Sequence, residues 1–285
     1  MKQILIISGK GGTGKTVITA SFAALAKNKV MVDADVDAAN LYLLLNPKIK
    51  SEDAYVGSQS ASIDAGKCIG CGKCEQVCRF NAIANKGGIY RVDELSCEGC
   101  GSCLIVCPNG AVTLEKEETG KWFISDTKYG AFVHAKLAIA QENSGKLVSI
   151  IREKAKDIAI ENNAEYIIID GPPGIGCPVI ASLSGVDMAV IVTEPSLSGI
   201  HDMERVVGVA KHFGVDTKVI INKYDINIEN TESINKFCKE KNIEVLGQLP
   251  FSDIVSQSVV KGIPIVEFCD EEITKNIKNL WEKIK

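Results

Sequence analysis

The segment that most constrains the fold of this chain is Gly9-Lys10-Gly11-Gly12-Thr13-Gly14-Lys15-Thr16. It matches the pattern G-x-x-x-x-G-K-[ST] in full, and it follows Ile4–Ser8, an apolar run typical of a buried strand. Glycines allow successive backbone N–H groups to turn toward phosphate oxygens. Because the residues after Thr16 have a helical pattern, the segment predicts a phosphate-binding loop between a strand and a helix, with each of its residues at the nucleotide.

Further apolar, β-branched runs recur along the chain and are separated by stretches of helix length. They are Val30–Asp33, Tyr166–Asp170, Ala189–Thr193, Lys218–Asn222 and Leu246–Pro250. Continuous runs of this kind predict strands that are buried on both faces, so we expect an α/β fold with a mostly parallel central sheet flanked by helices. The polar residues that follow the runs would then lie at the carboxyl edge of the sheet, where such sheets bind ligands.

The residue types at this edge suit a magnesium nucleotide. Lys15 is predicted to reach the β- and γ-phosphates, and the hydroxyl of Thr16 to bind Mg²⁺. Asp170 ends a strand run and is followed by Gly171-Pro172-Pro173-Gly174. Mg²⁺ prefers hard oxygen ligands and keeps several waters, so we expect Asp170 to hold the ion through water. A strand-end aspartate can instead cap a helix, but its combination with a phosphate loop favours the metal.

Two cysteine quartets occupy the middle of the chain. They are Cys68, Cys71, Cys74 and Cys78, and then Cys97, Cys100, Cys103 and Cys107. Their spacing is the bacterial ferredoxin run, in which three thiolates hold one [4Fe–4S] cluster and the fourth ligates the other. Cluster I is therefore predicted to bind Cys68, Cys71, Cys74 and Cys107. Cluster II is predicted to bind Cys97, Cys100, Cys103 and Cys78. Zinc in paired C-x-x-C sites is the alternative, and the third cysteine of each turn argues against it.

The second quartet is part of an internal repeat. Each cysteine of the first quartet has a counterpart at a constant offset, and Ala82-Ile83 corresponds to Ala111-Val112, so we expect pseudo-twofold symmetry. A segment this small has little core of its own, and metal clusters would supply the missing stability. The expected organisation is an ATPase domain in two parts, 1–62 and 115–285, with a small ferredoxin-like α+β domain inserted at 63–114.

The phosphate loop carries a second lysine, Lys10, and with it the sequence resembles the MinD/Mrp family of P-loop ATPases, which includes the nitrogenase iron protein and ParA. The resemblance implies a P-loop NTPase fold, ATP as the nucleotide, and a nucleotide-dependent homodimer in which Lys10 reaches the partner's phosphates. It also implies that Asp33–Asn40 is the first switch, in which Asp35 orients the attacking water, and that Gly171–Gly176 is the second switch. Lys10, Lys15 and Asp35 are thus the expected catalytic residues.

The resemblance covers the whole chain. Asn222 and Pro250 correspond to the family's adenine-binding positions. The stretches Glu142–Lys146, Gly171–Pro178 and Thr193–Asp202 resemble members with an inserted ferredoxin domain. In the nitrogenase iron protein, a cysteine near the second switch binds a cluster that bridges the dimer. Cys177 lies near this switch with different spacing, and a buried structural thiol is the alternative interpretation.

Composition excludes several other classes of protein. The chain of 285 residues has a formal net charge of −4, which gives no global attraction to nucleic acid or to anionic membranes. No apolar run is long enough to span a bilayer. There are 11 cysteines, but the ferredoxin spacing and the absence of a leader favour a cytoplasmic, metal-bound protein over a disulfide scaffold. The apolar face of 273–284 predicts a helix packed on the sheet, with a membrane-binding helix as the alternative.

Together, these features predict an ATPase whose nucleotide state gates electron transfer through two [4Fe–4S] clusters to a redox partner. The predicted switches bracket the γ-phosphate, and the cysteine insert lies between them in sequence. Two other interpretations remain open. One is a carrier or scaffold that donates clusters to an apo-acceptor protein, and the other is a positioning ATPase of the MinD or ParA kind.

Overall fold

The computed structural model describes residues 1–138 and 144–285 and divides the chain into two compact units. The first is formed by Met1–Asp53, Trp122–Leu137 and Ser144–Lys285, and the second by Ala54–Lys121. The second unit is wider at both ends than the predicted insert, 63–114. The reason is that the chain passes between the units inside two long strands rather than in loops. Glu142 and Asn143, which begin one of the stretches quoted above, lie outside the described residues.

A nine-stranded sheet has the strand order β11-β10-β9-β1-β8-β2-β7-β6-β3. Its strands are β1 (Lys2–Ser8), β2 (Lys29–Asp33), β3 (Lys48–Ile63), β6 (Val112–Thr127), β7 (Gly130–Leu137), β8 (Tyr166–Pro173), β9 (Met188–Thr193), β10 (Asp216–Asn222) and β11 (Glu244–Leu249). Each pairing from β11 across to β7 is parallel. Two residues separate β6 from β7, too few for a crossover, so this pair is antiparallel. The predicted α/β fold with a mostly parallel sheet is confirmed.

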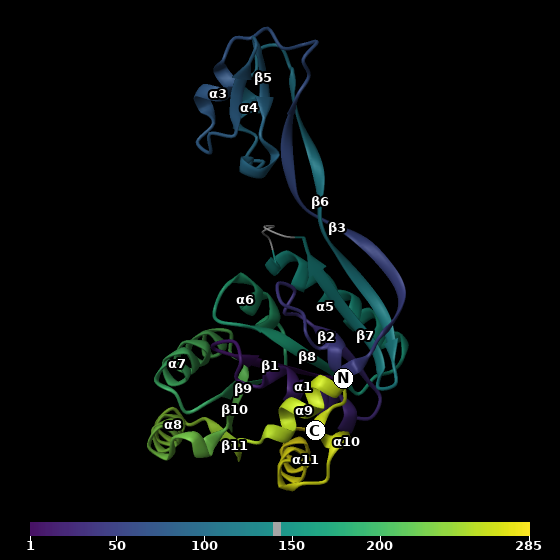
Figure 1. Cartoon of the computed structure of the whole chain (residues 1–285), viewed down its shortest axis with the longest axis vertical. Helices are drawn as coiled ribbons and strands as arrows, with labels where there is room; N and C mark the ends of the chain where they lie inside the picture. The colour runs from purple at the N-terminus through teal and green to yellow at the C-terminus, as the bar shows by residue number, and fades with distance from the viewer. Residues whose placement is uncertain (139–143) are drawn as a thin grey trace. The chain divides into compact units, whose positions relative to one another are not determined.

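Helices cover both faces of this sheet in the first unit (Figure 1). On one face lie α1 (Lys15–Leu25), α10 (Ile265–Phe268) and α11 (Glu272–Ile284). On the other lie α5 (Ser144–Glu161), α6 (Cys177–Leu183) and α7 (Leu197–His212). The remaining elements of the unit are α2 (Tyr42–Leu45), η2 (Tyr224–Ile226), α8 (Ile228–Glu240) and α9 (Asp253–Lys261).

The apolar strand runs form the core, as their composition requires. The four residues Ile4–Ile7 of β1 have no exposed surface, which a strand covered on both faces demands. Ile4 and Ile6 belong to the cluster that also holds Phe22 of α1 and Trp281 of α11. The ring centroids of Phe22 and Trp281 lie 5.4 Å apart, so α1 and α11 pack against each other over the central strands.

Three strands of the nine-stranded sheet were not predicted, namely β3, β6 and β7. Most side chains of β3 and β6 are exposed or half-buried, and both sequences are rich in polar and charged residues. A strand that covers little core lacks the continuous apolar run by which the other strands were found. Their pairing partners, rather than their own composition, therefore determine that these segments are strands.

The second unit has the predicted internal symmetry. It contains α3 (Lys73–Val77), the antiparallel pair β4 (Ile83–Lys86) and β5 (Ile89–Val92), η1 (Glu94–Ser96) and α4 (Ser102–Val106). The N–H of Asp64 donates to the carbonyl of Ala111 at 2.8 Å, and the N–H of Asp93 donates to the carbonyl of Ala82 at 2.7 Å. These two bonds are exchanged by the sequence repeat, so the pseudo-twofold relation extends to the backbone.

The C-terminal helix α11 is a packed helix. Its apolar residues Ile273, Ile277, Leu280, Trp281 and Ile284 are each at most 5% exposed, and they belong to the core over the sheet. The prediction of a last helix packed on the sheet is therefore confirmed. Within residues 1–138 and 144–285, no helix has the length and apolar character needed to cross a bilayer.

One half-buried imidazole gives the first unit a testable pH dependence. His134 of β7 stacks between Phe123 and Phe132, with centroids 4.9 and 4.6 Å away, and its Nε2 lies 3.1 Å from Ser125 Oγ. Burial lowers the pKa of His134 to about 4. An unfolded histidine has a pKa of about 6.5, so the unfolded state takes up a proton first, and folding stability is lost as the pH falls from 6.5 toward 4.

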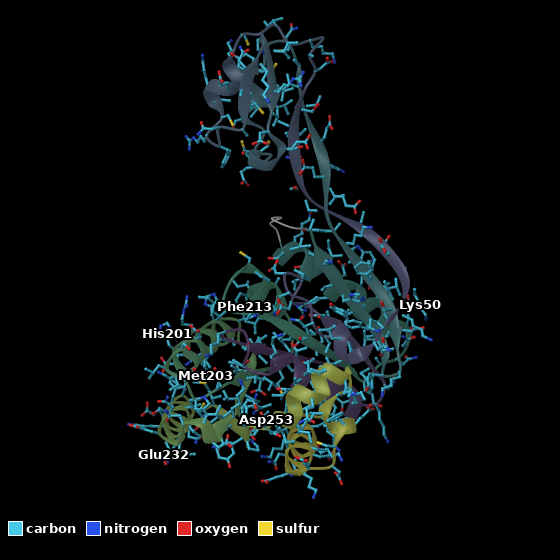
Figure 2. All side chains as sticks on the ribbon, in the orientation of Figure 1. Lys50, His201, Met203, Phe213, Glu232 and Asp253 are labelled. Atoms are coloured by element: carbon cyan, nitrogen blue, oxygen red, sulfur yellow. The ribbon has the colours of Figure 1, made fainter. Side chains whose placement is uncertain are left out.

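We expect His134→Phe to remove this contribution. Between pH 7 and pH 5, the free energy of unfolding of the wild type should fall by on the order of 1 to 2 kcal/mol more than that of the variant. Urea unfolding at the two pH values measures the difference. His201→Phe is the control, because His201 lies on the surface of α7 with its side chain 70% exposed (Figure 2). Equal pH dependence in His134→Phe and wild type would contradict the assignment.

Candidate nucleotide and cluster sites

The predicted phosphate loop connects β1 to α1 at the carboxyl edge of the sheet. Gly12 and Gly14 have φ angles of +80° and +91°, a conformation that side chains disfavour. A Cβ on Gly14 would lie 2.3 Å from Nδ2 of Asn222, and one on Gly9 would lie 2.4 Å from the backbone of Asp202. Gly12 and Gly14 are therefore required by the backbone conformation of the turn, and Gly9 and Gly14 are required by close packing against neighbouring residues.

Asp170 is the centre of the polar network behind the loop. Its carboxylate is 1% exposed and accepts hydrogen bonds from the hydroxyls of Thr16 and Thr19, each at 2.8 Å. The ammonium of Lys15 lies 3.1 Å from Asp170 Oδ1 and 3.8 Å from Asp35 Oδ2. Lys15, Thr16, Asp35 and Asp170, predicted from separate motifs, are thus brought to one place.

The charges in this network shift one another's titration. Burial opposes the charged form of Lys15, but the carboxylates of Asp170, Asp33 and Asp35 outweigh it and raise the pKa of the ammonium. Burial raises the pKa of Asp35 to about 6. Burial, and then the charge of Asp170, raise the pKa of Asp33 to about 8. A bound cation among these carboxylates would favour their charged forms.

Asp33 is a site residue that sequence reasoning assigned no role. It is fully buried at the end of β2 and accepts backbone N–H bonds from Asp35, Asn40 and Leu41 at 3.0 to 3.2 Å. These bonds hold the segment that carries Asp35. Its position at the end of a strand run was the available signal. However, the sequence alone does not distinguish an aspartate that anchors the backbone from one that binds a metal ion.

A cavity of about 440 Å³ opens in front of the loop, a volume within the usual range for small-molecule sites. Its polar wall contains Lys15, Thr16 and Asp35, and its apolar wall contains Leu43, Leu44 and Val259. Within the loop, Thr13 Oγ1 is buried and has no hydrogen-bond partner among the described residues. An unpaired buried hydroxyl beside a row of backbone N–H groups suits an anionic oxygen ligand.

The predicted adenine residues lie outside the lining of this cavity. The amide nitrogen of Asn222 donates to the carbonyl of Thr13 at 2.8 Å, so the side chain supports the phosphate loop from below. Pro250 follows β11, and the N–H of its neighbour Phe251 donates to Asp225 at 2.7 Å. Adenine contact by Asn222 and Pro250 stays a prediction.

Lys10 is held by residues of its own chain. Its ammonium lies 2.6 Å from Glu194 Oε1 and donates to the hydroxyls of Ser196 and Ser198 at 2.9 and 3.1 Å. Lys223 pairs with the other oxygen of Glu194 at 3.0 Å and donates to the carbonyl of Gly12 at 3.2 Å. Glu194 lies in the stretch Thr193–Asp202, yet its pairing with Lys10 and Lys223 is visible only in three dimensions.

The two predicted sets of cysteines line two separate small hollows of the second unit. The first cysteine hollow is lined by Cys68, Cys71, Cys74 and Cys107, together with residues such as Ile69 and Tyr90. The second cysteine hollow is lined by Cys97, Cys100, Cys103 and Cys78, together with residues such as Phe80 and Glu98. In each hollow the fourth cysteine comes from the other half of the repeat, which is the exchange that the ferredoxin spacing requires.

The donor set and the backbone of these hollows fit a cube bound by four thiolates. Gly72 and Gly101 have nearly identical φ angles, 74° and 76°, and start the short helices that follow the two turns. Among the described residues, no three His, Cys, Asp or Glu side chains are grouped closely enough for a single metal ion. A [4Fe–4S] cluster does not require such a group, because each of its four thiolate ligands binds a different iron atom and the four sulfurs surround the cluster.

The sulfur atoms also receive hydrogen bonds. The N–H of Ala61 donates to Cys97 Sγ at 3.4 Å, and the N–H of Ala111 donates to Cys107 Sγ at 3.3 Å. The side-chain hydrogen bond with Ser102 lowers the pKa of Cys100. In contrast, burial raises the pKa of Cys74 and Cys103. Hydrogen bonds to a cysteine sulfur, unlike burial, stabilise the thiolate, which is the form in which cysteine binds metals.

The three other cysteines are scattered. Cys177 begins α6 and is exposed, so the alternative of a buried structural thiol is wrong for this residue. Cys238 is fully buried in α8, and burial raises its pKa to about 11. Cys269 is half-buried and lies near Thr274. A thiol with the character of Cys238 is inert toward metals and oxidants.

A comparison with known protein families agrees with this geometry. Residues 4–265 match the model of the CobQ/CobB/MinD/ParA nucleotide binding domain. The chain belongs to this family. The fold and the phosphate loop described above are therefore those of a nucleotide-binding ATPase of the MinD/ParA kind.

The chain is also similar to individual proteins of known sequence or structure. The protein MJ0578 of Methanocaldococcus jannaschii is 33% identical over 99% of this chain and 96% of its own length. The iron–sulfur cluster carrier protein of the same organism is 24% identical over 99% of this chain and 85% of its own. The fold is similar to that of the septum site-determining protein MinD from Pyrococcus horikoshii, solved with Mg-ADP (TM-score 0.61, 18% identity, 100% and 96% coverage).

We expect Thr16→Val to weaken nucleotide binding in a magnesium-dependent way, because the variant keeps the shape of threonine but lacks the oxygen that Mg²⁺ needs. Affinity for ATP in the presence of Mg²⁺ should fall by about tenfold or more, and affinity measured with a chelator should change less. Titration calorimetry or fluorescent-nucleotide binding measures both values.

Ser21→Ala is the matched control for this prediction. Ser21 is buried in the same helix, but its hydroxyl donates to the backbone carbonyl of Val17 at 2.7 Å. Its loss should leave the magnesium dependence as in the wild type. If Thr16→Val bound ATP with an unchanged preference for Mg²⁺, the assignment of Thr16 as a metal ligand would be wrong.

Proposed function

We propose that this protein hydrolyses ATP and that its nucleotide state gates electron transfer through two [4Fe–4S] clusters to a partner protein. The observation that carries the proposal is the exchange of the fourth cysteine between the two hollows, in a chain that also contains the phosphate loop. A nucleotide fold alone is shared by many functions. Four thiols around each of two hollows, in ferredoxin order, favour iron–sulfur chemistry over zinc.

In the nucleotide half of the proposal, each residue has a defined task. Lys15 neutralises charge on the β- and γ-phosphates, while Thr16 and Asp170 hold Mg²⁺, Asp170 through water. Asp35 orients the water that attacks the γ-phosphorus as the bond to the bridging oxygen breaks, which yields ADP and phosphate. With a pKa of about 6, Asp35 is mostly ionised at pH 7 and accepts a hydrogen bond from that water.

In the cluster half of the proposal, cysteine thiolates supply soft ligands and the cubes supply one-electron chemistry. Cys71 and Cys100 are exposed, one in each quartet, whereas Cys74 and Cys103 are buried. A partner protein would approach each cluster from the side of its exposed cysteine. The relationship to an iron–sulfur cluster carrier supports the presence of clusters but leaves their use to experiment.

Covalent continuity gives the two halves a means of communication. The segment that carries Asp35 is followed by α2 and then directly by β3, and β3 continues into the second unit. We further propose a nucleotide-dependent homodimer, in which Lys10 exchanges Glu194 for the partner's phosphates. Glu194 retains Lys223 as its counter-ion after this exchange, so its half-buried carboxylate is not left unpaired.

The test measures cluster reduction as a function of nucleotide. Protein purified without oxygen and reconstituted with iron and sulfide should contain about eight iron atoms per chain, as two cubes require. We expect the fraction of reduced cluster at a fixed potential to differ several-fold between MgADP, a non-hydrolysable MgATP analogue and no nucleotide. Electron paramagnetic resonance during a redox titration follows each cluster.

Lys15→Ala provides the control, since its clusters should form but ignore nucleotide. Equal reduction curves in all three nucleotide states of the wild type, with equal rates of oxidation by a soluble viologen, would remove the gating proposal. Zinc instead of iron in protein prepared without oxygen would remove the cluster proposal altogether.

A second candidate function is cluster delivery, which is favoured by the similarity to the cluster carrier protein. The fate of the iron during ATP turnover separates the two functions. A gated electron carrier keeps its iron while the clusters cycle. A delivery protein loses cubes to an added apo-ferredoxin, and the loss is faster with nucleotide.

A further inference from the structure

The two cysteine turns differ at a position that contacts a sulfur. In the first turn, Cys71-Gly72 is followed by Lys73, whereas in the second turn Cys100-Gly101 is followed by Ser102. Ser102 Oγ lies 3.5 Å from Cys100 Sγ, which is a hydrogen bond to a sulfur atom. The repeat thus places a hydroxyl beside the exposed thiol of one quartet and a lysine at the same position of the other.

Local structure places Ser102 next to this sulfur. Gly101 takes φ 76° and ψ −1°, and Ser102 is the first residue of α4. Gly72 takes φ 74° and ψ −3° before Lys73, the first residue of α3. Since the backbones of the two turns match, the difference between the hollows at this point comes from the side chain alone.

The direction of this hydrogen bond depends on the state of Cys100. In the free protein the thiol of Cys100 donates to Ser102 Oγ. A thiolate that binds iron has no proton, so the contact persists when the hydroxyl of Ser102 donates to Cys100 Sγ. A hydroxyl can rotate to do so at no steric cost, and the bond then stabilises negative charge on the sulfur.

Each hollow also has a backbone N–H that donates to a cysteine sulfur. Ala111 N–H donates to Cys107 Sγ in the first, and Ala61 N–H donates to Cys97 Sγ in the second. Ser102 therefore adds a side-chain donor to the second hollow. Cys100 is exposed, so water competes for the same sulfur, and the expected effect is several-fold rather than several orders of magnitude.

We propose that Ser102 raises the reduction potential of cluster II by donating a hydrogen bond to Cys100 Sγ. The inference rests on the proposed function, in which this quartet holds a [4Fe–4S] cluster. Reduction adds one electron from an external reductant to a cluster that is surrounded by four thiolates. A donor aimed at one of these sulfurs favours the more negative, reduced state, and hydrogen bonds to sulfur are a known determinant of cluster potential.

The experiment compares Ser102→Val with Ser102→Thr, which have the same shape and differ by the hydroxyl. The wild type and three variants, Ser102→Val, Ser102→Thr and Ser102→Ala, are reconstituted with clusters in the absence of oxygen. The iron and sulfide content of each protein is measured before the redox titration. At a fixed potential, the ratio of reduced to oxidised cluster II should fall several-fold in Ser102→Val and Ser102→Ala, where tenfold corresponds to about 59 mV for one electron. Ser102→Thr should remain near the wild type, and cluster I should not change.

Ser96→Ala is the matched control, because Ser96 precedes the ligand Cys97 but its hydroxyl donates to Asp93 Oδ2 at 2.6 Å. It should leave both potentials unchanged. Equal potentials for cluster II in Ser102→Val, Ser102→Ala, Ser102→Thr and wild type, all fully loaded, would overturn the inference and leave the proposed function intact. Loss of cluster II from Ser102→Val and Ser102→Ala alone would assign the hydroxyl to cluster binding and would also overturn it. Wild-type protein without iron would refute the proposed function itself.

Discussion

The pairing of the buried Asp170 carboxylate with α1 is the interaction on which the nucleotide site depends. Asp170 lies on β8, between β1 and β2, and is bound by Lys15, Thr16 and Thr19 from the first turns of the helix. A buried carboxylate without these partners would cost several kcal/mol. The helix therefore has one favourable position on the sheet, and the phosphate loop that precedes it is placed accordingly.

The sequence predicted the residues of this site better than their contacts. Lys15, Thr16, Asp35 and Asp170 came from three separate segments, and they meet because parallel strands end at the same edge. Asp33 and Glu194 were missed as partners, since their roles depend on which side chains face them across the fold. The strands β3 and β6 were missed for a related reason: their polar sequences contain no buried run that would reveal them.

In the second unit, by contrast, the spacing of the cysteines was enough to predict which of them line the same hollow. Glycines before α3 and α4 turn the chain so that three cysteines of each run line one hollow, and the short helices send the fourth to the other. A repeated backbone with matched hydrogen bonds makes this exchange reciprocal. The boundaries of the unit were harder to predict, because its ends lie within the continuous strands β3 and β6 and no loop marks them.

Donor chemistry also keeps the two proposed cofactors apart. The nucleotide site offers carboxylate and hydroxyl oxygens, which suit Mg²⁺ and bind iron–sulfur clusters poorly. Each cysteine hollow offers soft thiols, which have little affinity for Mg²⁺. A chain that must carry both is served by placing each donor set in its own compact unit, since neither ion then competes for the other's ligands. In the proposed gating, communication between the units would pass along β3 and β6, the two strands whose residues belong to both units.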